Sequence, residues 1–219
     1  MRASFRVVLG GRRVVVLAPT TILARQLYSS FLARLGPYSV NVEVVSRFRS
    51  LKKIKLVQEK ILLKENDILI GTHAVLNNDI YLKNIGLLVV DEEHRFGVGQ
   101  KEKIRRFKES ADVLSMSATP IPRSLNLALS GIHSISLLQT PPLMRLPIVT
   151  HVDYFNDKLI YEAISFEVER GGQVYFVHNN IQSIESIVDR LRRILPDMKI
   201  IFIHGQEPPR DVEKKMDLF

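Results

Sequence analysis

The stretch Leu87-Leu88-Val89-Val90-Asp91-Glu92-Glu93-His94 places four apolar residues before three carboxylates and an imidazole. A short run of Leu and Val without polar alternation is typical of a parallel strand that is buried on both faces. Open α/β sheets bind ligands at the carboxyl ends of such strands, which is where the acidic group begins. The stretch therefore predicts both a fold class and the position of a site.

Each polar residue of this stretch has a candidate role in phosphate chemistry. Asp91 is predicted to hold Mg²⁺, directly or through water, because carboxylate oxygens suit a cation that carries nucleotide phosphates. Glu92 is the candidate base that orients water for attack on a γ-phosphate, and His94 completes the polar group. The alternative is that these side chains form a solvated surface or the N-cap of the next helix.

Further apolar runs alternate with helix-like segments on both sides of this stretch. The other predicted strands are Val14–Leu17, Val40–Val45, Ile68–Ile70, Val113–Met116, Ile135–Leu138, Val174–Val177 and Lys199–Ile203. The predicted helices are Thr21–Leu35, Leu51–Leu63, Gln100–Lys108, Pro122–Leu129, Leu159–Arg170 and Ile181–Ile194. This alternation predicts an α/β fold, a mostly parallel sheet with helices on both faces.

Prolines divide the chain into two parts. Pro141, Pro142 and Pro147 disfavour regular helix and central strand, so residues 140–150 are predicted to be a linker. It separates a first domain at residues 1–139 from a second at residues 151–219. The second domain is expected to be truncated, because residues 207–219 are charged and interrupted by proline, and no strand follows.

Hydroxyl residues follow three other predicted strands. Ser117 and Thr119 follow Val113–Met116, and from there they can hydrogen-bond the acidic site and pass its nucleotide state to the second domain. The alternative is a turn that caps the next helix. Thr20 and Thr21 open a helix whose N-terminus suits a DNA phosphate, although an N-cap role explains them too.

Two further segments are candidates for contact with nucleic acid. Thr72 and His73 follow Ile68–Ile70 and offer a small turn to the same DNA backbone, although a lone His is more often structural. Arg47 and Arg49 flank Phe48 just after a predicted strand, which favours a phosphate or stacking contact. The alternative for this segment is a solvated loop with Phe48 packed inward.

Composition excludes several other classes. The chain has 219 residues and a net charge of 31 − 23 = +8, a modest indication of a polyanionic partner such as DNA. It contains no cysteine, which excludes disulfides and thiolate metal sites. No apolar stretch is long enough to span a membrane, and no signal-peptide pattern is visible, so a cytoplasmic location is expected.

Four segments have the order of motifs Ia, Ib, II and III of superfamily-2 helicases. They are Ala18-Pro19-Thr20-Thr21, Gly71-Thr72-His73, Asp91-Glu92-Glu93-His94 and Ser117-Ala118-Thr119. Longer strings, among them DEEHRFGV at residues 91–98 and ATPIPR at residues 118–123, closely resemble the transcription-repair coupling factor family over nearly the whole chain. The resemblance implies a nearly complete first RecA-like helicase lobe and the start of a second.

The same resemblance implies a motor that uses ATP and Mg²⁺ to track along double-stranded DNA, with RNA polymerase and excision-repair proteins as partners. By this likeness Asp91 and Glu92 serve the metal and the water. Ser117 and Thr119 would couple the lobes, and Thr20, Thr21 and Thr72 would touch the DNA backbone. SRFRS at residues 46–50 favours this family over RecG-type helicases, which share the other strings.

The sequence also departs from the family pattern. It has no G-x-x-x-x-G-K-[ST] loop to hold the β- and γ-phosphates, and it is expected to end before motifs V and VI. A missing arginine finger alone costs on the order of 10³ to 10⁵ in rate, so the chain is expected to be inactive by itself. The alternatives are a RecG-type helicase fragment and a non-catalytic nucleic-acid-binding module on a helicase scaffold.

Overall fold

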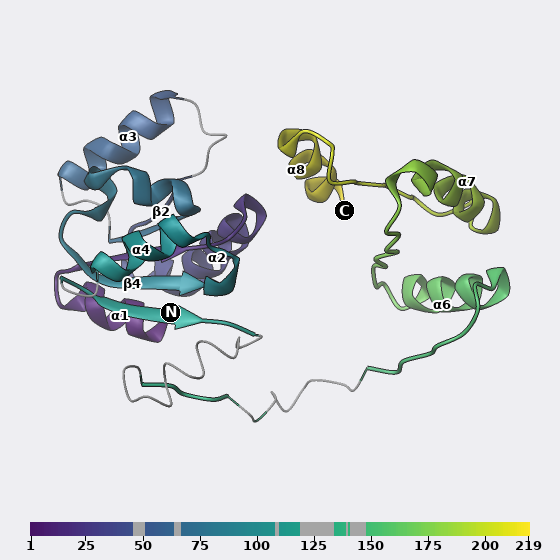
Figure 1. Cartoon of the computed structure of the whole chain (residues 1–219), viewed down its shortest axis with the longest axis horizontal. Helices are drawn as coiled ribbons and strands as arrows, with labels where there is room; N and C mark the ends of the chain where they lie inside the picture. The colour runs from purple at the N-terminus through teal and green to yellow at the C-terminus, as the bar shows by residue number, and fades with distance from the viewer. Residues whose placement is uncertain (46–50, 64–66, 108–109, 119–133, 139, 141–147) are drawn as a thin grey trace. The chain divides into compact units, whose positions relative to one another are not determined.

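The computed structural model describes residues 1–45, 51–63, 67–107, 110–118, 134–138, 140 and 148–219. The chain groups into two compact units, Met1–Ser136 and Leu137–Phe219. The first unit holds the sheet, and the described part of the second holds helices joined by irregular segments (Figure 1). Each unit is described by itself.

The sheet of the first unit has five parallel strands in the order β2-β3-β1-β4-β5. The strands are β1 (Arg13–Leu17), β2 (Val42–Val45), β3 (Ile68–Gly71), β4 (Ile85–Asp91) and β5 (Asp112–Met116). All five were expected from the sequence. The order places β1 centrally and β4 between β1 and β5, so the acidic strand has a neighbour on each side.

Helices cover both faces of this sheet. They are α1 (Arg2–Leu9), α2 (Thr21–Leu35), α3 (Leu51–Leu62) and α4 (Val98–Phe107). Short 3₁₀ turns add η1 (Gly36–Tyr38), η2 (His73–Asn77), η3 (Asp79–Leu82) and η4 (Glu93–Arg95). The expected helix at Pro122–Leu129 lies outside the described residues.

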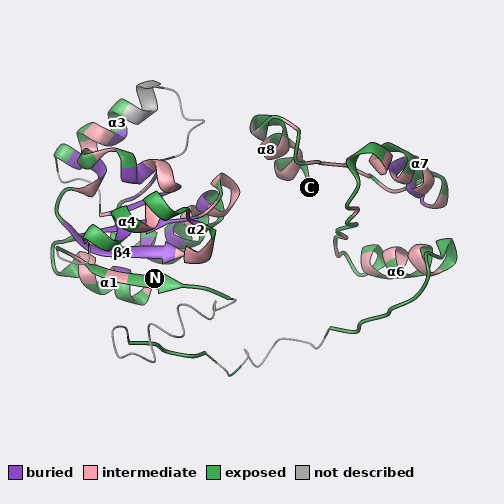
Figure 2. Cartoon of the chain, viewed as in Figure 1, coloured by how far each residue is buried: buried purple, intermediate pink, exposed green. Residues whose placement is uncertain are grey.

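Side chains alternate along the strands and so build two cores. Val14 and Val16 face α1 and α2, while Val15 and Leu17 face α3, α4 and the 3₁₀ turns. Figure 2 shows β4 as a continuous buried band. This two-faced burial explains why the strands contain apolar runs without alternation. The α/β prediction, with helices on both faces of a parallel sheet, is confirmed.

The strand β4 contains one bulge, at Gly86. Arg13 pairs with Ile85 and Val14 pairs with Leu87, so Gly86 is skipped in the register. Ile85 therefore lies in the same core as Leu88, although a regular strand would place it with Leu87. A Cβ at Gly86 would lie 2.7 Å from Arg12 Cβ, which explains the glycine.

The edge strand β5 differs from the other strands. It pairs with β4 on one side and, within the described ranges, with no strand on the other. Four of its five residues are exposed, and Leu114 and Met116 retain 41% and 40% of their accessible surface. The sheet thus presents apolar side chains at this edge.

The described part of the second unit contains three α-helices and a 3₁₀ turn. These are α6 (Asp157–Glu169), η5 (Ile181–Ser183), α7 (Ile184–Ile194) and α8 (Pro209–Leu218). Asn156 caps α6 by accepting hydrogen bonds from the amides of Lys158 and Leu159. No helix was predicted in residues 207–219, where proline was taken as an interruption, but Pro209 opens α8 at a position where a missing N–H costs nothing.

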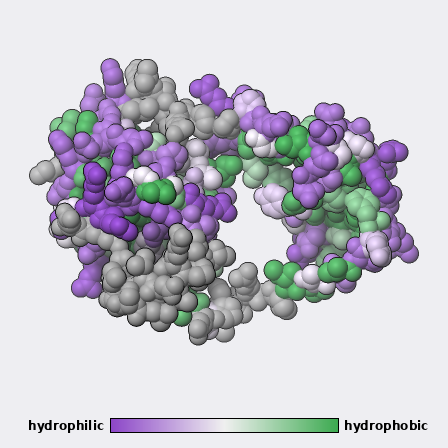
Figure 3. Space-filling model, viewed as in Figure 1, coloured by the Kyte–Doolittle hydropathy of each residue, from purple (hydrophilic) through white to green (hydrophobic). Residues whose placement is uncertain are grey.

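Three predicted strands are not strands in the structure, namely Ile135–Leu138, Val174–Val177 and Lys199–Ile203. A strand needs a hydrogen-bonded neighbour, and the described residues offer these segments none. Val177 is 88% exposed and Leu138 is 99% exposed. Figure 3 shows apolar side chains at the surface of this unit.

Candidate functional site

The candidate site lies at the carboxyl edge of the sheet. Because all strands are parallel, the segments after β1, β3, β4 and β5 emerge at this one edge. Leu17 is level with both Gly71 and Val90, and Asp91 is level with Met116. The sheet therefore brings together residues that the sequence separates by about a hundred positions.

A hydrogen-bonded cluster joins the end of β4 to the end of β5. His94 Nδ1 lies 3.2 Å from Glu92 Oε2 and 3.3 Å from Ser117 Oγ. The Ser117 hydroxyl lies 3.4 Å from the same Glu92 oxygen, to which it donates. The structure thus brings together three of the predicted catalytic residues, Glu92, His94 and Ser117.

Glu92 has a strained backbone. Its φ of 50° and ψ of 52° lie in the left-handed region, where a residue with a Cβ pays on the order of 1–2 kcal/mol. The turn leads into η4, and Phe96 after it is buried with 5% of its surface exposed. Phe96 anchors the turn in the core, and the turn keeps the Glu92 carboxylate beside Ser117.

The pKa of Asp91 is raised above its ordinary value. Burial raises its pKa first, and the negative charge of Glu92 raises it further, against a backbone hydrogen bond that lowers it. A cation beside Asp91 would relieve both effects. Within the described ranges no group of three or more His, Asp or Glu side chains is arranged to hold a metal ion.

The residues present still fit one kind of metal site. Mg²⁺ in nucleotide sites takes one or two carboxylates from the protein and the rest of its ligands from phosphates and water. Asp91, with its raised pKa and the adjacent Glu92, meets that requirement. Asp91 is therefore the candidate ligand for Mg²⁺ carried by a nucleotide.

The hydroxyl residues at this edge differ in accessibility. Thr20 is exposed and caps α2, its Oγ1 accepting from the Leu23 amide at 3.3 Å, and Thr21 is half-buried. Thr72 is buried with 5% of its surface exposed, and its carbonyl accepts from the Val75 amide. His73 is half-buried. The cap role that the sequence left open for Thr20 is therefore real, and it leaves the threonine at the surface.

Three predicted site residues, Arg47, Arg49 and Thr119, lie outside the described residues. The sequence analysis expected Ser117 to hydrogen-bond the acidic site, and its contacts with Glu92 and His94 agree with that expectation. Sequence reasoning missed that one Glu92 oxygen contacts both His94 and Ser117. It also missed that Gln100 caps the next turn, accepting from the Gly97 amide at 3.0 Å. None of the helices in the described ranges is long and apolar enough to cross a membrane.

The parallel sheet, the acidic strand end and its bond to the following strand define a RecA-like helicase lobe. The chain belongs to the DEAD/DEAH box helicase family, whose model matches residues 2–128. Within this family it is similar to transcription-repair-coupling factors. That of Haemophilus influenzae is 46% identical and that of Escherichia coli is 43% identical, each over 219 residues and 100% of this chain.

Solved structures support the same class. The structure of RecG bound to a three-way DNA junction is 28% identical, with a TM-score of 0.70 over 95% of this chain and 28% of that one. The Mycobacterium smegmatis helicase Lhr bound to single-stranded DNA and AMP-PNP shares the fold, with a TM-score of 0.62 over 94% of this chain, 32% of that one and 16% identity.

The chain spans only a fraction of these proteins. It covers 19% of the length of each of the two coupling factors. The chain itself therefore establishes the family. The activity of a complete motor depends also on parts of the relatives that this chain does not cover.

Proposed function

We propose that the chain is the part of an ATP-driven double-stranded DNA translocase that carries its water-activating carboxylate, in a protein of the transcription-repair-coupling type. The cluster of Glu92, His94 and Ser117 carries the proposal. It connects the acidic end of β4, whose carboxylates suit phosphate chemistry, to the segment that leaves β5. Identity of 46% with a coupling factor over the whole chain, against 28% with RecG, favours this type over the RecG type.

In this function Asp91 holds Mg²⁺ and Glu92 orients the attacking water. Magnesium, when bound, neutralises charge that develops on the phosphate oxygens. Glu92 accepts from the Ser117 hydroxyl and lies beside His94, so its orientation is set by two neighbours. A general base must be positioned before its pKa matters, and these contacts position it.

Ser117, with Thr119 after it, is proposed to pass the state of the nucleotide site to the second unit. Ser117 ends β5 and contacts the Glu92 carboxylate, so a reoriented Glu92 breaks a hydrogen bond at the root of the connecting segment. We infer that residues 1–139 form a first lobe, residues 140–150 a linker and residues 151–219 the beginning of a second lobe.

DNA is proposed to run along the same edge of the sheet. Thr20 and Thr21 offer hydroxyls and the N-terminus of α2 to phosphate, and His73 is partly accessible. Thr72 is buried, so its part in the contact is to hold the turn that presents His73. Arg47 and Arg49 are proposed as further phosphate contacts. RNA polymerase and excision-repair proteins are the proposed partners of the longer protein.

The purified 219-residue chain is proposed not to hydrolyse ATP by itself, because it has no G-x-x-x-x-G-K-[ST] loop. The test therefore uses a chimera, in which this chain replaces the homologous segment of the Escherichia coli coupling factor, to which it aligns over its whole length. ATP hydrolysis is measured with and without double-stranded DNA, in the chimera and in the isolated chain.

DNA-stimulated hydrolysis is expected in the chimera and not in the isolated chain. Glu92→Gln should lower the chimera's rate by at least about 100-fold, since a general base contributes on that scale. Glu102→Gln, at an exposed position of α4, is the matched control and should leave the rate unchanged. A folded chimera without turnover, or one indifferent to Glu92→Gln, would refute the proposal.

A further inference from the structure

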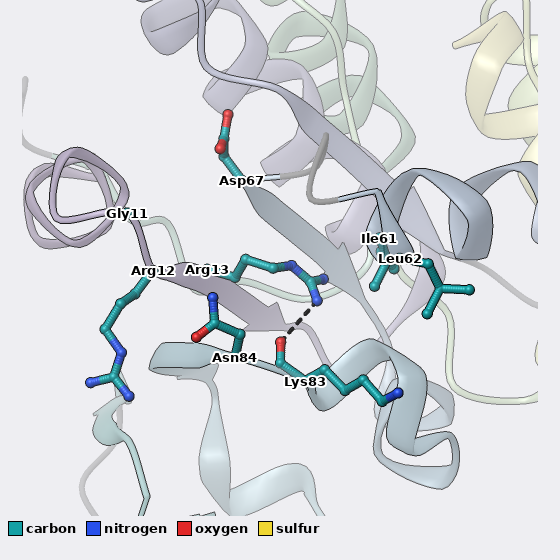
Figure 4. A pocket seen from close by; sticks show the side chains of 8 residues that line it. All are labelled: Gly11, Arg12, Arg13, Ile61, Leu62, Asp67, Lys83 and Asn84. Carbon is teal, nitrogen blue, oxygen red and sulfur yellow. Dashed lines mark hydrogen bonds between the residues drawn. The ribbon is translucent and has the colours of Figure 1, made fainter.

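A cavity opens at the amino edge of the sheet, opposite to the site described above. Its volume is about 450 Å³, and Figure 4 shows the side chains that line it. They come from the α1–β1 turn, the end of α3 and the segments before β3 and β4. The lining residues are Gly11, Arg12, Arg13, Ile61, Leu62, Asp67, Lys83 and Asn84.

Arg13 is the central polar group of this cavity. Only 6% of its surface is exposed, and its Nη1 donates to the Lys83 carbonyl at 3.0 Å. In Figure 4 its guanidinium extends across the cavity toward the Lys83 backbone. Burial lowers the pKa of Arg13, and the charge of Asp67 raises it in part.

The alternation of β1 places Arg13 there, on the same face as Val15 and Leu17. It pairs with Ile85, one residue before the skipped Gly86, and the bulge turns Ile85 to the same face, which α3 covers. Bulges redirect side chains and are frequent next to binding sites. Two residues in left-handed conformation, Gly11 at φ 72° and Asn84 at φ 55°, flank Arg13, whose amide donates to the Asn84 carbonyl.

The charges around the cavity favour an anion. Three cationic side chains, Arg12, Arg13 and Lys83, line it against one carboxylate, that of Asp67. Asp67 Oδ2 already accepts from the Asn41 amide at 2.8 Å, and Figure 4 shows its carboxylate directed away from Arg13. Arg12 and Lys83 are exposed long side chains, so both can turn toward a bound group.

The remaining wall is apolar. Ile61 of α3 is buried and Leu62 beside it is 58% exposed. A volume of about 450 Å³ falls within the range of roughly 300–1,000 Å³ that is usual for small-molecule sites. Sites of this kind combine apolar walls with a few placed polar groups. The cavity is therefore suited to a molecule with an anionic end and a flat or apolar body.

We propose that this cavity binds a mononucleotide-sized phosphate ester, with its phosphate between Arg13, Arg12 and Lys83 and its base against Ile61 and Leu62. Arginine binds phosphate through two parallel N–H donors, and Lys83 adds a point charge. The site lies at the end of the strands opposite to Asp91, so it is separate from the proposed site of hydrolysis.

The test is a titration of the ¹⁵N-labelled 219-residue chain with AMP, followed by amide chemical shifts. The expected result is saturable shifts at Gly11, Arg13, Asp67 and Asn84, with none at Asp91 or Glu92. Adenosine, which lacks the phosphate, and inorganic phosphate, which lacks the base, are titrated in parallel. Both are expected to bind at least about tenfold more weakly than AMP, since each lacks one half of the contacts.

The double variant Arg12→Gln, Lys83→Gln removes the two exposed cations and leaves buried Arg13 and the fold in place. It should weaken AMP binding by at least about tenfold. Arg105→Gln, which removes an exposed cation of α4, is the matched control and should bind AMP like the parent chain. Equal binding of AMP by the double variant, or equal affinity for adenosine, would overturn the proposal. Shifts confined to residues 91–117, or the same shifts with an acidic hexapeptide, would also overturn it.

Discussion

The two units of this chain contain similar sequence patterns with different structural outcomes. In the first unit, β1 and β3 are buried at every residue, and both are flanked by paired strands. In the second unit Val174–Val177 is equally apolar, yet within the described residues it has no strand partner, and Val177 is 88% exposed. An apolar run therefore becomes a buried strand only where adjacent strands supply backbone hydrogen bonds and other elements shield its side chains from water.

The second unit relies on contacts between its helices instead. Arg190 of α7 lies 2.9 Å from Asp157 of α6, and its guanidinium lies 4.4 Å from the centre of the Phe155 ring. Val188, Leu191 and Leu195 form its buried apolar positions. Helices close their own backbone hydrogen bonds, which explains why helices and not strands are present there. The first unit should consequently lose more stability when a core side chain is shortened.

The largest effect is expected from Leu88→Ala in β4, compared with Leu191→Ala in α7. Leu88 is completely buried within a core supplied by four strands and two helices, so its loss should cost about 2–5 kcal/mol. Leu191 is 5% exposed, but the only other buried apolar residues described in its unit are Val188 and Leu195, so a loss of about 1–2 kcal/mol is expected. Urea unfolding followed by circular dichroism measures both.

Leu218→Ala is the control for this pair. Leu218 is 78% exposed in α8, so its change should stay within about 0.5 kcal/mol. If Leu191→Ala costs as much as Leu88→Ala, the second unit has a core of the same quality as the first, and the contrast between the units fails.

The next effect concerns the bulge in β4, through Gly86→Ala. A Cβ there would lie 2.7 Å from Arg12 Cβ and 2.8 Å from Val7 Cγ1, so α1 or the turn after it must move. Overpacking of this kind costs about 1–3 kcal/mol. Gly99→Ala in α4 is the matched control, because nothing lies within 4 Å of its Cβ, and it should stabilise by about 0.5–1 kcal/mol. Equal unfolding midpoints for the two variants would contradict this account.

Much of the first unit was predictable from sequence because each strand carries its own signal. The helix at Thr21–Leu35 and the five strands follow from periodicity and from buried apolar runs. The bulge was not predictable, because one glycine in an apolar run does not reveal which neighbour it pairs with. Arg13 was missed for a different reason: it reads as a charged residue before the predicted strand Val14–Leu17, whereas in the structure it is the first residue of β1 and is buried.

The sequence predicted which residues form the acidic site and that Ser117 can hydrogen-bond it, but not the geometry of the contacts. Asp91, Glu92, His94 and Ser117 follow strands, and parallel strands bring their ends to one edge. Glu92 has a left-handed backbone conformation, which holds its carboxylate near Ser117. This conformation could not be predicted, because glutamate rarely adopts it. In the second unit the strand predictions failed because pairing depends on partners, and α8 was missed because proline at a helix start was taken for a break.

The two units should also respond differently to pH, beginning with Glu207 in the second. Its carboxylate accepts from Lys215 Nζ at 2.8 Å, and this hydrogen bond lowers its pKa below the ordinary value of 4.5. The stability it contributes is present at neutral pH and is lost as the pH falls through the lowered pKa. Glu207→Gln should therefore destabilise by about 1 kcal/mol at pH 7.

Thermal or urea unfolding at neutral pH and near pH 3 provides the measurement for Glu207→Gln. The difference from the parent chain should shrink at the lower pH, where the parent carboxylate is being protonated. Glu169→Gln, at the exposed end of α6, is the matched control and should show little effect at either pH. A pH-independent difference would mean that Glu207 acts through packing and not through its charge.

The smallest effect is expected at Asp91, and its sign is opposite. Burial and the charge of Glu92 raise its pKa above the ordinary value of 3.8, so the folded state binds more protons than the unfolded state between 3.8 and the raised pKa. Stability then falls as the pH rises through that window. Asp91→Asn should raise stability at pH 7 by less than about 1 kcal/mol, with no gain below pH 3.8. Asp112→Asn, at an exposed position of β5, is the control. If Asp91→Asn instead lowers stability at pH 7, the Asp91 carboxylate is stabilised in the folded chain, by a bound cation or by solvent, and the account above is wrong. The stability difference between variant and parent should therefore change with pH in opposite directions for Asp91 and Glu207. Such a result would show that the Asp91 carboxylate destabilises the fold, as expected of a residue retained for chemistry, whereas the Glu207 carboxylate stabilises its own unit.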